Sequence, residues 1–165
     1  MDQKQQRDHE IDLLKDQITH LTARVQELEE MVHQMSFPII PSIIPNTILI
    51  PITGELSPER FEVMIPKILE YTADNPVDSI IIDFTAISIR EVTCLNILSQ
   101  YVGDLNSALK LMGVQVLVVG FNPQFTQELV RSGLSFIKEL NAFSTFRAAL
   151  QSLAKQKGIS LEKTK

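Results

Sequence analysis

The sequence predicts an α/β domain with a mixed, mostly parallel sheet between helices, preceded by a long N-terminal coiled-coil helix. Three observations carry this prediction. Apolar residues recur every three or four positions before the first proline, and short β-branched runs alternate with helical patterns after it. Two of those runs are apolar throughout, which is typical of strands in a parallel sheet that helices cover on both faces.

We expect residues 1–36 to form a helix that dimerises as a coiled coil. Over four heptads the a positions are β-branched and the d positions are Leu or Met, which favours a parallel two-stranded coil. In such a pair Glu10 at g would face Lys15 at e of the other chain, and Arg24 would face Glu29. The predicted dimer seam consists of Ile11, Leu14, Ile18, Leu21, Val25, Leu28, Val32 and Met35.

An amphipathic helix that packs on its own domain is the alternative interpretation of this segment. A helix of a globular domain usually shows an apolar face wider than a strict a/d stripe, so the coiled coil is preferred. The helix should end near Ser36, because Pro38, Pro41 and Pro45 follow it and each opposes helix continuation.

Residues 37–156 are expected to form the globular domain, with residues 157–165 as a flexible charged tail. The element order is β-β-α-β-α-β-α-β-α. The first two strands correspond to "PIIPSII" and "NTILIPITG", with Asn46 in the turn between them. Pro51 within the second strand indicates an edge position or a bulge, because proline cannot donate to a ladder.

The remaining elements alternate between helix and strand. Two helices begin where a capping residue precedes a proline, at Ser57-Pro58 and Asn122-Pro123, and two end at a glycine. We therefore expect a helix from Pro58 to about Thr72, a strand in "VDSIIIDF", a helix over Glu91–Met112, a strand in "VQVLVVG", a helix from Pro123 to Gly133, a weak strand at Phe136–Ile137 and a last helix over Ala142–Ala154.

The composition argues against several classes of function. A net charge of −5 provides no broad basic face for nucleic acid. No apolar run approaches the ~20 residues of a membrane span, and Cys94, the single cysteine, has no partner for an internal disulfide. We therefore expect a cytoplasmic protein that binds neither nucleic acid nor membrane and needs no metal or cofactor.

Catalysis is the minor hypothesis. Cys94 has no histidine in its own domain to activate it, and no glycine-rich phosphate loop follows a strand. Asp83 and Glu91 can form a carboxylate pair, but nothing else converges with them. A flavodoxin-like enzyme, which is one open alternative, should show the missing phosphate loop.

The motifs "IIIDFTAIS…EVTCLN" and "LKLMGVQVLVVGFNPQFTQELVRSG", taken in order, resemble the STAS domain of anti-sigma-factor antagonists. Within that family they are most similar to RsbR-type proteins of the bacterial stressosome. The resemblance covers about residues 36–153 and includes a G-x-x-P turn from Gly120 to Pro123. It implies a STAS fold and a non-catalytic scaffold. It also implies partners, namely RsbS-like STAS proteins and a serine/threonine kinase of the GHKL type.

The same resemblance implies where regulation acts. In the family, a kinase phosphorylates a hydroxyl at a helix start, where backbone N–H groups and the helix dipole favour negative charge. Here the two positions that correspond to the phosphorylated hydroxyls hold Val92 and Glu128. Thr93 follows the first of these positions by one residue and is the candidate substitute acceptor. A carboxylate at Glu128 would imitate a phosphate weakly. The expected partner-docking edge comprises Asp83, Thr85, Ser88, Glu91 and Asn122.

A function from another class also remains open. STAS domains occur in transporters, so an accessory domain for small-molecule or lipid transport is the runner-up. The sequence shows no transporter segment or lipid-facing helix that would favour it.

Overall fold

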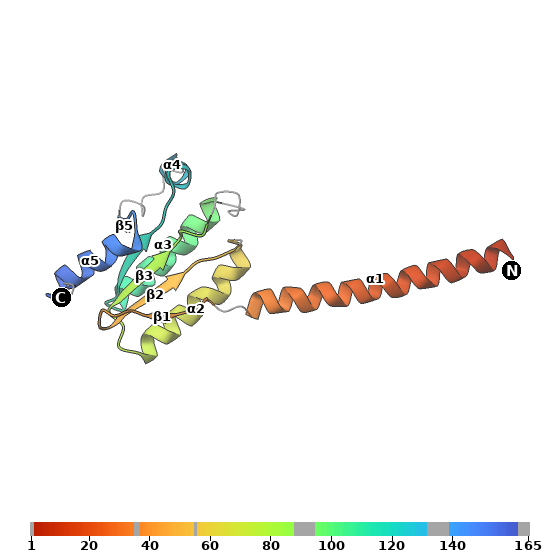
Figure 1. Cartoon of the computed structure of the whole chain (residues 1–165), viewed down its shortest axis with the longest axis horizontal. Coiled ribbons are helices and arrows are strands. Elements are labelled where there is room, and N and C mark those ends of the chain that lie inside the picture. The colour runs from red at the N-terminus through yellow and green to blue at the C-terminus, as the bar shows by residue number, and fades with distance from the viewer. Residues whose placement is uncertain (1, 35–36, 55, 88–94, 132–138, 162–165) are drawn as a thin grey trace. The chain divides into compact units, whose positions relative to one another are not determined.

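The structure of this chain, a computed structural model, describes residues 2–34, 37–54, 56–87, 95–131 and 139–161. It divides into two compact units, residues 1–36 and residues 37–165 (Figure 1).

The first unit is one long helix, α1 (Gln3–Gln34), which confirms the predicted N-terminal helix. Its described seam side chains are all strongly exposed, from 45% at Leu28 to 63% at Ile18. The side chains of Val32 and Met35 lie outside the described residues. Arg24 Nη1 lies 2.6 Å from Glu27 Oε2, on the polar surface of the same helix. An apolar stripe that is exposed along a whole helix lacks the burial that normally stabilises such helices in water.

The second unit contains a five-stranded sheet in the order β1-β2-β3-β4-β5. The first pair is antiparallel and the other three pairs are parallel, which confirms the predicted mixed, mostly parallel sheet. The strands are β1 (Ile40–Pro41), β2 (Thr47–Pro51), β3 (Ser79–Asp83), β4 (Gln115–Val119) and β5 (Asn141–Phe143).

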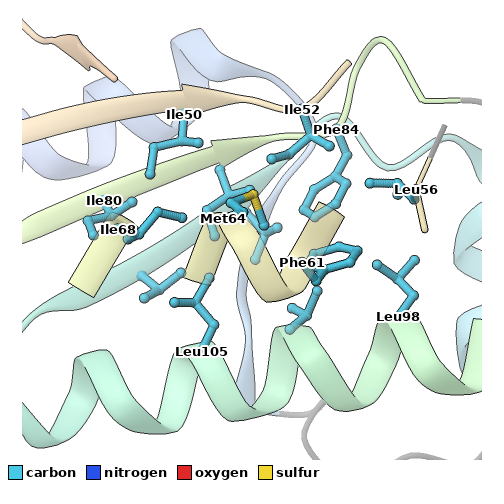
Figure 2. Packing of buried hydrophobic residues seen from close by; sticks show 14 of the residues in the cluster. Ile50, Ile52, Leu56, Phe61, Met64, Ile68, Ile80, Phe84, Leu98 and Leu105 are labelled. Carbon is cyan, nitrogen blue, oxygen red and sulfur yellow. The ribbon is translucent and has the colours of Figure 1, made fainter. Parts of the chain in front are cut away.

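Alternate residues of each strand point to opposite faces of this sheet. Since both sets are apolar in the central strands, helices cover both faces. On one face a large apolar cluster joins the sheet to α2 (Pro58–Asp74), α3 (Leu95–Leu111) and α4 (Pro123–Arg131). Figure 2 shows part of this cluster between α2, α3 and the sheet. On the other face a smaller cluster joins Ile81 and Leu117 to α5 (Phe146–Gln156).

Local signals set several element ends as predicted. Ser57 accepts a hydrogen bond from the Arg60 amide and caps α2. Asn46 adopts a φ of +57° in the turn before β2, a conformation that asparagine tolerates. At the end of α3 the Val114 N–H donates to the Leu109 carbonyl at 2.9 Å, with Gly113 at φ +77°. These two features define a Schellman motif that requires the glycine.

The C-terminal elements differ from the prediction. The last helix was expected from Ala142, but Asn141–Phe143 pairs with β4 as the edge strand β5, and α5 begins at Phe146. A three-residue strand is too short to show an alternating pattern, and the capping hydroxyl of Thr145 marks the true helix start. The strand expected at Phe136–Ile137 and the first residues of the helix expected from Glu91 lie outside the described residues.

The N-terminal strands are also shorter than the apolar runs that predicted them. Pro51 is the last residue of β2, which is the second strand of the sheet and not its edge. Ile52 N–H donates to the Asp83 carbonyl of β3, so the nitrogen of Pro51 points to the opposite side. The pairing of β1 with β2 covers only Ile48 and Leu49. Pro51 therefore removes no hydrogen bond from the ladder.

Lys157, predicted to lie in the flexible tail, forms hydrogen bonds with residues at the start of the sheet. Its Nζ donates to the Pro45 carbonyl at 2.7 Å, to Thr47 Oγ1 at 3.2 Å and to Asp78 Oδ1 at 2.5 Å. Burial acts to raise the pKa of the Asp78 carboxyl, but hydrogen bonds from Lys157 and Ser79 and the charge of Lys157 outweigh it. The net effect lowers this pKa below its ordinary value of 3.8.

Candidate functional site

The candidate site is the docking edge at the carboxyl ends of β3 and β4. Asp83 and Val119 are paired at the last position of the two strands. The residues that follow, Thr85 after β3 and Asn122 after β4, therefore leave the sheet at the same edge. This is the edge where α/β sheets usually place their functional groups.

Asp83 organises the turn that follows β3. Its Oδ1 accepts hydrogen bonds from the Thr85 amide at 2.8 Å and from Thr85 Oγ1 at 2.5 Å. The amide of Phe84, the residue directly after Asp83, donates to the Val119 carbonyl at 2.9 Å. This bond extends the pairing of β3 with β4 by one residue. The carboxylate thus holds the exposed Thr85 hydroxyl in place, which is a structural role.

Gly120 brings the two loops of the docking edge into contact. Its φ is +82°, and a Cβ at this position would lie 2.7 Å from the Thr85 Cα, closer than real atoms approach. Only glycine fits both the left-handed backbone and the space. The sequence identifies Gly120 only as part of the G-x-x-P turn, because a close approach between two loops leaves no mark in a single sequence.

The helix α4 presents the second half of the edge. Asn122 Oδ1 accepts from the Phe125 amide at 2.7 Å, which confirms Asn122 as the N-cap. The exposed Thr126 donates its hydroxyl to the Asn122 carbonyl at 2.9 Å. Glu128 Oε1 lies 2.9 Å from Arg131 Nη1, and both side chains face solvent. The charge of Glu128 is therefore partly balanced by its neighbour, which weakens any likeness to a phosphate.

Three phenylalanines form an apolar floor beneath this edge, a feature that sequence reasoning missed. The ring centroids of Phe84 and Phe121 are 5.1 Å apart, and those of Phe121 and Phe125 are 5.2 Å apart. The cavity between these rings and α3 has a volume of about 10 Å³, roughly the size of one water. Small-molecule pockets measure about 300–1,000 Å³. The cavity beneath the described part of the edge is therefore far smaller than a small-molecule pocket.

The predicted site is only partly described. Asp83, Thr85 and Asn122 come together at one edge, with Glu128 further along α4. Ser88, Glu91, Val92 and Thr93 lie outside the described residues. Over the ranges that the structure does describe, no three acidic, histidine or cysteine side chains gather as metal ligands. Within those same ranges, every helix is too short or too polar to span a bilayer.

Residues 38–149 match the model of the STAS domain family, so this chain belongs to that family. It is 28% identical to a blue-light photoreceptor of Listeria innocua over 73% of this chain and 45% of that protein. It is 26% identical to the RsbT co-antagonist protein RsbRB of Bacillus subtilis over 65% of this chain and 37% of that protein. The chain thus spans less than half the length of these relatives.

Solved structures give the same fold. An RsbS protein of Moorella thermoacetica superposes with a TM-score of 0.61 at 15% identity, covering 74% of this chain and 98% of that one. A chain of the stressosome superposes with a TM-score of 0.58 at 14% identity, covering 73% of this chain and 98% of that one. The murine Solute Carrier 26 family member A9 anion transporter superposes with a TM-score of 0.60 at 14% sequence identity, covering 78% of this chain and 24% of that one. At these identities the likeness shows the fold alone.

Together these comparisons relate the chain, at low identity, to RsbR-type stressosome co-antagonists and to RsbS. STAS anti-sigma-factor antagonists are non-catalytic.

Proposed function

We propose that this chain is a cytoplasmic, non-catalytic scaffold of the stressosome type. Two copies join through α1, assemble with RsbS-like STAS proteins, and hold or release a serine/threonine kinase of the GHKL type. The observation that carries the proposal is an exposed a/d seam on α1 in the same chain as a STAS domain whose relatives include RsbT co-antagonists.

The surface of α1 supports a parallel homodimer. The described seam side chains are all exposed, and a second copy would bury them in knobs-into-holes layers. Arg24 pairs with Glu27 of its own helix while both side chains remain more than half exposed. Exposed pairs of this kind contribute little, so Arg24 can exchange Glu27 for Glu29 of a second chain at small cost.

The docking edge supports a protein partner. Asp83, Thr85 and Asn122 are fixed by local hydrogen bonds, so the edge is preorganised and loses little conformational entropy on binding. Regulation is proposed at Thr93, since the usual acceptor slots hold Val92 and Glu128. The ion pair with Arg131 reduces the negative field of Glu128, so this residue alone should not release the kinase.

Kinase binding can be tested with a matched pair of surface variants. Thr126→Arg adds a bulky charge to the exposed surface of α4, whereas Ala73→Arg adds the same charge near the far end of α2. By calorimetry with the cognate GHKL kinase, we expect Thr126→Arg to weaken binding at least about tenfold and Ala73→Arg to leave it unchanged. Absence of binding by the unaltered chain would refute the scaffold role.

Phosphorylation can be tested by intact mass after incubation with the kinase and ATP. We expect at most one phosphate, which Thr93→Ala removes and Thr126→Ala does not. A stoichiometric phosphate that survives Thr93→Ala would place regulation at another hydroxyl.

A further inference from the structure

The β1–β2 hairpin carries an unusual surface for the edge of a sheet. β1 is an edge strand, and the sequence holds no charged residue and no histidine between His33 and Glu55. Within this run Ile40 is 43% exposed and Ile43 is 81% exposed. Exposed edges usually carry charges that oppose association, whereas depletion of charge is a property of interface cores.

The apolar surface continues from β1 onto the neighbouring strand. Ile40 is paired with Leu49 of β2, and side chains at paired positions lie on the same face of the sheet. Leu49 is only half-buried, against the cluster that α5 covers, while Ile81 and Leu117 in the middle of that cluster are fully buried. The cover that α5 provides therefore leaves Leu49 half-buried, although it buries Ile44 in the turn of the same hairpin.

Strand addition is blocked at this edge. The Ser42 amide donates to the Thr47 carbonyl of β2 at 2.8 Å, so the neighbouring position 41 faces outward. Proline at that position has no N–H to offer to another strand. A partner must therefore contact this surface through side chains and not by extending the sheet.

We propose that Ile40, Ile43 and Leu49, here called the hairpin patch, pack against the hairpin patch of the second copy in the dimer. This inference rests on the coiled coil of the proposed function. A charge-free patch meets its own copy without like-charge repulsion, and a two-fold axis makes such a contact self-complementary. The hairpin patch is then a second dimer contact, which fixes the two STAS domains relative to each other.

The length of the connecting chain supports a second copy as the occupant. α1 ends at Gln34 and β1 begins at Ile40, so the connecting chain can extend at most about 20 Å from the end of the helix to Ile40 and about 30 Å to Ile43. Helix axes in a coiled coil are about 8–10 Å apart. The two patches are thus confined within roughly 70 Å, which corresponds to an effective concentration in the millimolar range. At that concentration even a weak apolar contact is populated.

Cysteine cross-linking of the full chain tests this contact. Ile43→Cys is compared with Leu111→Cys, since Leu111 is 90% exposed at the end of α3, which covers the face of the sheet opposite to α5. The unaltered chain, with Cys94 alone, sets the background. At micromolar concentration under mild oxidation, we expect Ile43→Cys to form a disulfide-linked dimer at least about tenfold faster than Leu111→Cys.

Light scattering of the same samples separates this inference from the coiled coil. A dimer in which Ile43→Cys cross-links no faster than Leu111→Cys would overturn the hairpin contact and leave the coiled coil intact. A monomer would overturn both. If Ile43→Cys cross-links only to an added RsbS-like protein carrying its own surface cysteine, the hairpin patch binds that protein and not a second copy.

Discussion

At the scale of single residues, the docking edge depends on a position that has no side chain. Gly120 holds a left-handed backbone conformation and lies directly against Thr85, whose hydroxyl and amide both donate to Asp83. One glycine thereby joins the loop after β3 to the loop before α4. A second glycine, Gly113, has a similar φ but faces open space, which makes the two positions a natural comparison.

Replacing these glycines by alanine should separate backbone strain from steric conflict. Gly113→Ala carries only the cost of a left-handed alanine, about 1–2 kcal/mol. Gly120→Ala adds the clash with Thr85, and overpacking typically costs a further ~1–3 kcal/mol. Urea denaturation should therefore show the larger loss for Gly120→Ala. Equal losses at both positions would mean that the two loops do not touch.

The ion pair between Asp78 and Lys157 predicts a pH dependence. The folded-state pKa of Asp78 lies below its ordinary 3.8, so the contribution to stability is present above pH 3.8 and is lost as the pH falls through the folded pKa. The pair is half-exposed at Asp78, so the contribution should not exceed about 1 kcal/mol. In urea titrations, the unaltered chain and Asp78→Asn should differ by a constant amount near neutral pH and converge below pH 3.8. A difference that grows on acidification would contradict the assignment.

At the scale of elements, the sequence predicted those parts whose signals are local. Capping hydroxyls, prolines at helix starts and the glycine after α3 act within a few residues, so Ser57, Asn122 and Gly113 mark element ends correctly. The residues of the edge strand β5 were predicted in part as the start of the last helix, because the strand's only support is a partner strand more than twenty residues away, which a local pattern cannot reveal.

The candidate site shows the same limit. The positions of Asp83, Thr85 and Asn122 at one edge follow from strand ends in a parallel sheet, and were predictable. The aromatic floor of Phe84, Phe121 and Phe125 was not, because it joins residues from two loops and a helix. A pattern of apolar residues tells which side chains are buried, but not which of them meet.

The cap of α5 provides a test at this scale. Thr145 Oγ1 accepts from the Ala148 amide at 3.2 Å, and loss of such a cap typically costs about 0.5–2 kcal/mol. Thr126 is the matched control, since its hydroxyl donates back to a carbonyl within an exposed helix, where removal should change stability by less than about 0.5 kcal/mol. Thermal denaturation of Thr145→Ala and Thr126→Ala should show this order. The reverse order would mean that α5 does not begin at Phe146.

At the scale of the whole molecule, the proposal assigns separate tasks to separate surfaces. The seam of α1 joins two copies, the hairpin patch fixes their STAS domains, and the docking edge faces the kinase. None of these surfaces needs a catalytic group, which is consistent with the non-catalytic family to which the chain belongs. The scaffold then acts through the number and arrangement of docking edges that it presents.

Sedimentation of the full chain at low micromolar concentration tests the central claim most directly. We expect one species at twice the chain mass of 18.6 kDa. Leu21→Lys, which places a charge in the seam, should shift it to a single chain, whereas Ala23→Lys, outside the seam, should not. An unaltered chain that sediments as a single copy, or a dimer that Leu21→Lys leaves intact, would contradict the account.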